Sequence, residues 1–160
     1  MIGNDVVDIA LARKDSNWER PGFLPKIYTL HEQQLITTAA NPELAVWNLW
    51  SKKEAAYKVL ARQKNIRRFI PLQLECQTLD DYGEVRCSDT IFYTQTEATE
   101  DFIHSTAVAI AADITRVIEI PATTEILKVG SLPFIKDVLD RLKPVSVSHH
   151  GRFHRIVTLQ

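Results

Sequence analysis

Two carboxylates in this sequence stand where the neighbouring residues are mostly apolar. Asp5 falls inside the apolar run from Ile2 to Ile9, and Glu54 falls among apolar and aromatic residues that recur at helical spacing. Aspartate is a poor strand former, and a buried carboxylate without a partner costs several kcal/mol. Each of these two charges therefore needs compensation.

The sequence leaves open what compensates them. Glu54 and Lys58 stand at the i,i+4 spacing, which stabilises an exposed helix by about 0.2–0.5 kcal/mol. A strand-end cap or an exposed strand face would explain Asp5, and it explains Asp8 better still. Alternatively, Asp5 and Glu54 hold a hard divalent cation such as Mg²⁺, which prefers carboxylate, water and phosphate oxygens as ligands.

The element expected to carry Glu54 is a helix from Asn41 to about Arg62. Asn41 is a good N-cap, Pro42 suits the first helical position, and Glu43 is favoured by the helix dipole. Spacings of three and four predict that Glu54 shares a core-facing stripe with other residues. The stripe comprises Trp47, Trp50, Glu54, Tyr57 and Ala61.

Other elements are predicted from strand-forming and turn residues. A strand over Ile2 to Ile9 opens the chain, and Thr29 with Glu32 forms a capping box that begins a short helix. A hairpin is predicted from Ile70 to Thr96 with a turn at Asp80 to Gly83, followed by a strand from Phe102 to Ala112. A helix opened by Ser131 and Pro133 and ended by Pro144 should carry on one face Ile135, Val138, Leu139 and Leu142. The last prediction is a hairpin-like segment from Val145 to Leu159. Without regular βαβ alternation, this mixture indicates an α+β fold, an antiparallel sheet packed on the long helix.

Length and composition restrict the class of protein. The 160 residues, 45% of them hydrophobic, suffice for one core, so we expect residues 1–160 to form a single domain. A formal net charge of -1 argues against nucleic acid as a partner. Neither a signal sequence nor an apolar stretch of roughly 20 residues occurs, which predicts a soluble cytoplasmic protein that does not enter a membrane. Cys76 and Cys87 are expected to be reduced packing residues.

The segments around the two carboxylates form motifs. The first reads Ile2-Gly3-Asn4-Asp5-Val6-Val7-Asp8-Ile9, and the second reads Trp50-Ser51-Lys52-Lys53-Glu54-Ala55-Ala56-Tyr57-Lys58. Arg20, Phe23, Leu24, Ile27, Thr29 and Glu32 lie between them, and Val147-Ser148-His149-His150-Gly151-Arg152-Phe153 follows near the C-terminus. In this order the motifs resemble those of the 4′-phosphopantetheinyl transferase superfamily, especially its short, single-lobe holo-acyl-carrier-protein synthase type.

The resemblance implies a reaction and a set of site residues. The 4′-phosphopantetheine group of coenzyme A would pass to a serine of an acyl- or peptidyl-carrier protein, with release of 3′,5′-ADP. Asp5 and Glu54 would be the Mg²⁺ ligands, and Glu54 or a metal-bound water would be the general base. Lys58 would contact a phosphate of coenzyme A or assist proton transfer, with help from Lys53. Ser148 and His149 would lie near the nucleotide end of coenzyme A.

This chain also departs from the pattern of the family. The larger relatives carry a second acid two positions after the first aspartate, where this chain has Val7, so a third protein ligand to the metal is not supported. The short type has an arginine where Leu49 stands, and it continues after its lysine into a glycine-rich turn. Residues 59–62 replace that turn, so the phosphate contacts must be partly rearranged.

A cluster of basic residues follows the long helix. It comprises Arg62, Lys64, Arg67 and Arg68. Three roles are open: a solvated loop, a docking site for a small acidic carrier protein, or a replacement for the missing turn that holds the 3′-phosphate of coenzyme A.

Functions other than phosphopantetheine transfer have less support in the sequence. The case for zinc binding by His149, His150 and His154 is weak, because adjacent strand residues point to opposite faces. A non-catalytic module that binds coenzyme A or a carrier protein would not need Asp5, Glu54 and Lys58 together. An Mg²⁺-dependent phosphohydrolase would use water in place of the serine, and nothing in the sequence beyond the carboxylates favours it. Because the short relatives resemble trimers whose sites lie between subunits, we expect a homotrimer.

Overall fold

The first sheet carries Asp5 on an edge strand. The structure is a computed structural model that describes residues 1–160. Five antiparallel strands form this sheet, in the spatial order β1 (Ile2–Asp8), β5 (Phe102–Val108), β4 (Thr90–Ala98), β3 (Tyr82–Cys87) and β2 (Glu75–Cys76). The strand expected at the N-terminus is confirmed. It ends at Asp8 because this residue is the N-cap of the next helix.

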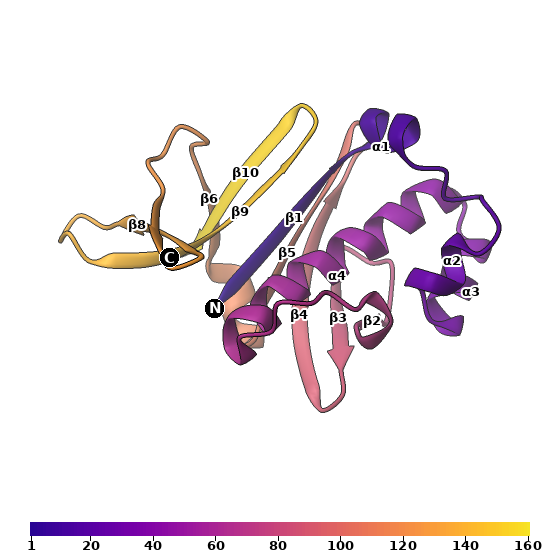
Figure 1. Ribbon diagram of the computed structural model, residues 1–160, viewed down its shortest axis with the longest axis horizontal. Coiled ribbons are helices and arrows are strands. Elements are labelled where there is room, and N and C mark those ends of the chain that lie inside the picture. The colour runs from indigo at the N-terminus through magenta and orange to yellow at the C-terminus, as the bar shows by residue number, and fades with distance from the viewer.

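Helices cover one face of this sheet (Figure 1). They are α1 (Ile9–Asp15), α2 (Phe23–Ile27), α3 (Leu30–Thr38) and α4 (Pro42–Lys64). Thr29 and Glu32 form the expected capping box at α3. Asn41 caps α4 through its side chain, with Pro42 in the first turn. The long helix is therefore confirmed, and it extends to Lys64 before Asn65 ends it in the left-handed conformation (φ 52°).

Close contact between α4 and β1 depends on Gly3. A Cβ atom at this position would collide with the carbonyl oxygen of Ala55. Ala55 and Ala56 are completely buried, as is Leu49, and they belong to a core cluster of 21 buried residues between the helices and the first sheet. Small residues on both elements therefore bring the backbone that carries Glu54 close to the strand that carries Asp5.

A second sheet lies on the other side of β1, as Figure 1 shows. It also has five strands, in the order β6 (Val117–Ile120), β10 (Phe153–Leu159), β9 (Leu142–His150), β8 (Leu132–Lys136) and β7 (Leu127–Val129). The expected terminal hairpin is confirmed as β9 and β10, which turn at Gly151. Two short 3-10 helices, η1 (Pro71–Gln73) and η2 (Ala111–Arg116), complete the fold.

Two predictions made from the sequence need correction. The helix expected from Ser131 is wrong, because this region forms β8 and the start of β9. The residues with helical spacing do not form a buried face: Val138 is 99% exposed and Leu139 is 67% exposed. The second correction concerns the segment before Thr96, which forms three strands instead of one hairpin. Bends around Asp80 and Asp81 join β2 to β3, as expected, and a further turn at Ser88 (φ 50°) joins β3 to β4.

Side chains join the two sheets along the outer edge of β1, which has no strand partner. Asn4 is fully buried there, and its backbone N–H donates to Ser146 Oγ (2.9 Å). The Asn4 side-chain amide donates to Ser148 Oγ (2.9 Å) and to the carbonyl of Arg155 (3.2 Å). The second sheet is therefore attached to β1 by specific polar bonds instead of a backbone ladder.

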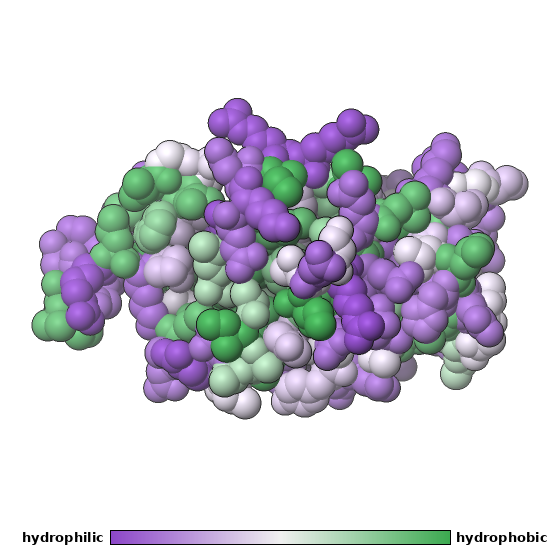
Figure 2. Space-filling model, turned by 90° about the horizontal axis from the view of Figure 1, so that it is seen from below, coloured by the Kyte–Doolittle hydropathy of each residue, from purple (hydrophilic) through white to green (hydrophobic).

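The surface is mixed in polarity. Figure 2 shows apolar side chains interspersed with polar ones, including over the end of the molecule formed by the second sheet. Exposed large apolar residues of that sheet and its turns include Val129, Val138, Leu139 and Leu142. None of the helices has the length and apolar character needed to cross a membrane.

Candidate active site

Asp5 and Glu54 line the same cavity. It has a volume of about 400 Å³ and lies where β1, α4 and the end of β9 meet. Trp47, Trp50, His149 and His150 also contribute to its wall. We call it the carboxylate cavity. The fold thus brings together the two carboxylates that the sequence singled out, although a long stretch of chain separates them.

The stripe predicted on the long helix faces both the core and the site. Trp47 is buried, but Trp50, Glu54, Tyr57 and Ala61 keep partial exposure. The first part of the stripe lines the carboxylate cavity, and Tyr57 with Ala61 lines a neighbouring cavity. Helical periodicity therefore identified the residues that share a face, and this face packs on the core through Trp47, Trp50 and Tyr57 while it also borders the two cavities.

The Asp5 carboxyl group is unusually reluctant to ionise. Burial, opposed by the positive charge of Lys58 and aided by the negative charge of Glu54, raises its pKa to about 7. The Lys58 ammonium lies 3.8 Å from Asp5 Oδ1. Burial also raises the pKa of Glu54 and lowers that of Lys58. At neutral pH the protein alone thus compensates this pair of carboxylates incompletely.

The donor set fits a hard divalent cation. Two carboxylates face one cavity, and the raised pKa of Asp5 shows that an added positive charge would be favourable there. No group of three or more histidine, cysteine, aspartate or glutamate side chains is arranged to hold a metal ion. Two carboxylates completed by water and substrate phosphates are a common arrangement for Mg²⁺, so the residues present match that ion.

Lys58 does not pair with Glu54 as the helical spacing suggested. Its ammonium donates to the carbonyl oxygen of Asn4 (2.6 Å) and to that of Val147 (3.4 Å), besides contacting Asp5. The i,i+4 explanation of Glu54 is therefore not the one that the structure adopts. Lys58 instead lies between β1 and β9, beside Asp5, one of the two candidate metal ligands.

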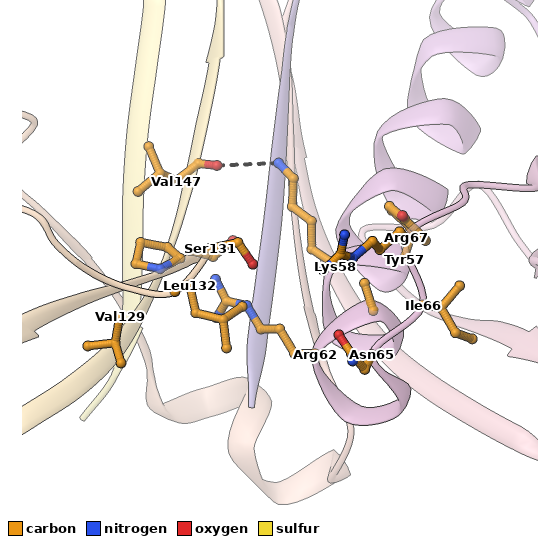
Figure 3. Close-up of a pocket in the computed structure, with 14 residues that line it drawn as sticks. Tyr57, Lys58, Arg62, Asn65, Ile66, Arg67, Val129, Ser131, Leu132 and Val147 are labelled. Atoms are coloured by element: carbon orange, nitrogen blue, oxygen red, sulfur yellow. Dashed lines mark hydrogen bonds between the residues drawn. The ribbon is translucent and has the colours of Figure 1, made fainter.

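A second cavity opens beside Lys58 (Figure 3). It has a volume of about 500 Å³ and lies between the C-terminal half of α4 and the second sheet. Its wall includes Lys58, Arg62, Arg67, Ser146 and the segment Val129–Pro133. We call it the cationic cavity. Lys58 borders it and also contacts Asp5 of the carboxylate cavity, so the two cavities adjoin at this residue.

Arg62 also reaches across the edge of β1. Its guanidinium donates to the carbonyl oxygen of Ile2 (3.1 Å) and to that of Val145 (2.6 Å). Figure 3 shows Lys58 and Arg62 extending from α4 toward the second sheet. Of the basic cluster named from the sequence, Arg67 joins Arg62 in the cationic cavity, and Lys64 and Arg68 do not line it.

The other predicted site residues have different surroundings. Ser148 is buried and accepts the bond from Asn4, so its hydroxyl faces the joint between the sheets. His149 is exposed and lines the carboxylate cavity, because neighbouring residues of β9 point to opposite faces. His149 and His154 lie opposite each other on β9 and β10, with ring centroids 5.8 Å apart.

Lys53 requires a correction. Its side chain is completely buried, and its ammonium pairs with the equally buried Glu32 at 2.6 Å. It also donates to the carbonyl oxygens of Ile27 (2.8 Å) and Pro71 (3.0 Å). Successive helical residues point about 100° apart, so Lys53 and Glu54 face different parts of the molecule. Lys53 anchors the helical region and lines neither cavity.

Sequence reasoning missed the contacts of Asp8 and His150. Asp8 caps α1 and also accepts hydrogen bonds from the backbone and guanidinium of Arg152. Its backbone N–H donates to His150 Nδ1 (2.9 Å), and His150 lines the carboxylate cavity. The sequence indicated only a capping role for Asp8, because its partners, His150 and Arg152, stand near the opposite end of the chain.

Comparison with known protein families covers the residues around both carboxylates. Residues 1–112, which include Asp5, Glu54 and Lys58, match the model of the 4′-phosphopantetheinyl transferase superfamily. The match ends before Ser148 and His149, so it does not extend to the resemblance noted for that segment. No curated protein matches the sequence.

Several solved structures share the fold. A holo-[acyl-carrier-protein] synthase from Helicobacter pylori, solved in complex with coenzyme A, is 19% identical, with a TM-score of 0.55 over 69% of this chain and 100% of that chain. The enzyme from Neisseria meningitidis is also 19% identical, with a TM-score of 0.55 over 68% and 96% of the two chains. The one from Thermotoga maritima is 15% identical, with a TM-score of 0.52 over 82% and 83%.

Proposed function

This chain belongs to the 4′-phosphopantetheinyl transferase superfamily, and from that premise we propose that it transfers 4′-phosphopantetheine from coenzyme A to a serine of an acyl- or peptidyl-carrier protein. One observation carries the proposal: Asp5 and Glu54 line one cavity, with the Lys58 ammonium 3.8 Å from Asp5. Paired carboxylates beside a cation suit the transfer of a phosphoryl-linked group, which depends mainly on charge neutralisation and positioning.

Asp5 and Glu54 are proposed as the protein ligands of Mg²⁺. The ion would supply neutralisation of the pyrophosphate charge as a Lewis acid. The raised pKa of both carboxyl groups supports this role, because a bound cation would favour their ionised forms. The Helicobacter pylori relative was solved with coenzyme A, and we propose coenzyme A as the donor here.

The chain's own residues would act on the proton and on the leaving group. Glu54 accepts the proton of the carrier serine, the role that the family resemblance gives it. The serine oxygen forms a bond to the β-phosphorus, and the bond from that phosphorus to the bridging oxygen breaks. The electron pair leaves with 3′,5′-ADP, whose negative charge lies toward Lys58.

The two cavities suggest how coenzyme A lies in the site. The cationic cavity offers Arg62 and Arg67 to the nucleotide end and its 3′-phosphate. The carboxylate cavity offers Trp47 and Trp50 to the phosphopantetheine arm. Trp47 has a buried indole N–H without an acceptor, which is available to an amide carbonyl of that arm. Because Lys58 already donates to Val147, its phosphate contact would replace that long 3.4 Å bond.

The proposed acceptor is a small acidic carrier protein. Lys64 at the end of α4 and Arg67 and Arg68 just beyond it are exposed, close to the cationic cavity. A local positive surface would attract an acidic partner even though the formal net charge of the whole chain is -1. Higher salt should therefore weaken carrier binding more than it weakens the chemical step.

The test combines purified protein, Mg²⁺, coenzyme A and apo acyl-carrier protein, followed by intact mass spectrometry of the carrier. A gain equal to one phosphopantetheine group, abolished by EDTA and restored by Mg²⁺, is expected. Hydrolysis of coenzyme A without any carrier would instead identify a phosphohydrolase. Tight binding of coenzyme A without transfer to any acyl- or peptidyl-carrier protein would identify a non-catalytic module.

A further inference from the structure

Residues 113–160 line the site although they lie beyond the family match. They contribute Ser146, Val147 and the segment Val129–Pro133 to the cationic cavity. They also contribute His149 and His150 to the carboxylate cavity. Both cavities thus have one wall from the family-matched part of the chain and another from the second sheet.

This second wall is attached to the first by bonds at both ends of β1. Near the start of the strand, Arg62 links the carbonyl oxygens of Ile2 and Val145. In the middle, Lys58 links those of Asn4 and Val147. The two cations, one helical turn apart on α4, therefore join β1 to β9 on the side of the cationic cavity.

At the other end of β1, Asp8 and Arg152 close the attachment. The Asp8 side chain is buried, and its Oδ2 accepts from the backbone N–H and Nε of Arg152, both at 2.9 Å. Its Oδ1 accepts from Nη2 at 3.0 Å. This arrangement makes a bidentate arginine–carboxylate pair, reinforced by a backbone donor.

Gly151 permits this close approach. The residue has φ 54°, which side-chain-bearing residues rarely adopt, and a Cβ atom would collide with the Asp8 carboxylate. The turn between β9 and β10 therefore sits directly against the carboxylate. His150, the preceding residue, accepts from the Asp8 backbone N–H while its ring lines the carboxylate cavity.

From these contacts we propose that residues 113–160 form an intramolecular second wall of the active site, positioned by the Asp8–Arg152 pair, so that one chain contains a complete site. The proposal rests on the proposed function for its reaction. Asp8 and Arg152 are positioning residues, because they act through His149 and His150. A neighbouring subunit, which the resemblance led us to expect, is not required to complete the site.

Loss of Arg152 should weaken substrate binding more than it slows the chemistry. Without the guanidinium, the turn at Gly151 loses its attachment to Asp8, and the wall that carries His149 and His150 is held less firmly. Asp5, Glu54 and Lys58 remain on elements packed in the main core. The KM for coenzyme A should therefore rise, while kcat changes less.

The first experiment compares Arg152→Ala and Arg152→Lys with the wild type, using Arg141→Ala as the control. Arg141 pairs with Asp137 in an exposed turn of the second sheet, away from both cavities. For Arg152→Ala we expect a rise in KM and in the calorimetric Kd for coenzyme A of about tenfold or more, consistent with the cost of a displaced positioning group. Arg152→Lys should recover part of this loss, because lysine keeps the charge but not the bidentate geometry.

Unchanged KM and Kd in folded Arg152→Ala protein would overturn the proposed role of the pair. The binding measurement also separates this inference from the proposed function. If the wild type transfers nothing but Arg152→Ala still weakens coenzyme A binding, the transfer function fails and the intramolecular wall stands. Hydrogen exchange should show faster exchange in β9 and β10 of Arg152→Ala, and unchanged exchange there would count against the wall's attachment.

The second experiment asks whether the wall comes from the same chain. Asp5→Ala lacks a metal ligand but keeps the wall, whereas Arg152→Ala keeps the ligand but has a weakened wall. The two variants are coexpressed with different tags, purified through both tags and assayed at low coenzyme A, with the separate variants alongside. If no doubly tagged species can be isolated, the chain works alone, as proposed. If mixed oligomers form, their activity should not exceed the average of the separate variants. Activity clearly above that average would show that neighbouring subunits exchange walls and would overturn the inference.

Discussion

The family-matched region and the C-terminal sheet are held together by different forces. Residues 1–112 contain a core cluster of 21 buried residues between α4 and the first sheet. The C-terminal sheet supplies only Val157 to a small buried cluster that it shares with Ile2 and Val108. Its outer strands, β7 and β8, have no fully buried residue. Hydrophobic packing dominates the first region, and polar bonds to β1 and α4 attach the second.

This difference assigns different tasks to the two regions. The groups proposed for the metal and the proton lie on β1 and α4, which the main core fixes firmly. The walls of the proposed coenzyme A site come partly from the thinner sheet. Variants in the first region should therefore abolish chemistry or stability, whereas variants at the joint should change affinity and its dependence on conditions.

The largest effect is expected from the two carboxylates. Asp5→Asn and Glu54→Gln should each lower transfer by about 10³-fold or more, because each removes a proposed charge at the metal. Both variants should remain folded, because the environment raises the pKa of each carboxyl group and does not favour its charge. Asp89→Asn, in an exposed turn between β3 and β4, serves as the control. The measurement is initial rate by carrier mass, and a fully active variant would remove that residue from the site.

Lys53→Ala tests the buried ion pair of the first region. Removing one member of a buried pair leaves the other charge uncompensated, so we expect a loss of about 3–5 kcal/mol in the free energy of unfolding. Urea denaturation measures this loss, with exposed Lys14→Ala as the control. If Lys53→Ala kept its stability and instead weakened coenzyme A binding, Lys53 would be restored to the site.

A glycine in each region provides the sharpest test of the packing difference. Gly3→Ala should cost about 3 kcal/mol, since the added methyl group would collide with the backbone of α4. Gly130→Ala meets open space and should cost only about 1 kcal/mol, which reflects its positive φ of 62°. Thermal or urea unfolding of the two variants gives the comparison. Equal losses would contradict the view that only the first region is tightly packed.

The smallest effect concerns the pH dependence of the joint. The Arg152 guanidinium holds the pKa of Asp8 well below its usual range. A lowered pKa in the folded state stabilises the protein above the unfolded-state pKa of about 3.9, and this contribution is lost as the pH falls below that value. Asp8→Asn keeps a good helix cap but removes the charge.

The free energy of unfolding should therefore be lower in Asp8→Asn than in the wild type at pH 7, and the difference should shrink as the pH falls below about 4. Urea titrations at a series of pH values measure it. A difference that grew on acidification would contradict the assigned role of the Arg152 contact.

Local chemistry made part of this structure predictable. The capping box at Thr29, the cap at Asn41 and the shared face of Trp50 and Glu54 all depend on residues a few positions apart, and each is confirmed. The failed helix after Ser131 shows the limit of periodicity, because its apolar residues lie in an exposed turn and on strands.

Long-range partners were not predictable in the same way. No sequence spacing relates Asp8 to Arg152 or Lys53 to Glu32, since the fold alone brings these side chains together. For the same reason, sequence could not tell that neighbouring Lys53 and Glu54 serve different purposes, one buried in the core region and one facing a cavity. Knowledge of which residues carry chemistry thus came from motifs, and knowledge of which residues hold them came from the structure.

The central claim is that Asp5 and Glu54 act together in transferring phosphopantetheine. The most direct measurement is intact mass spectrometry of an apo acyl-carrier protein after incubation with coenzyme A, Mg²⁺ and either the wild type, Asp5→Asn or Glu54→Gln. The account predicts one added phosphopantetheine with the wild type and none with either variant over the same time. Equal modification of the carrier by all three proteins would contradict it.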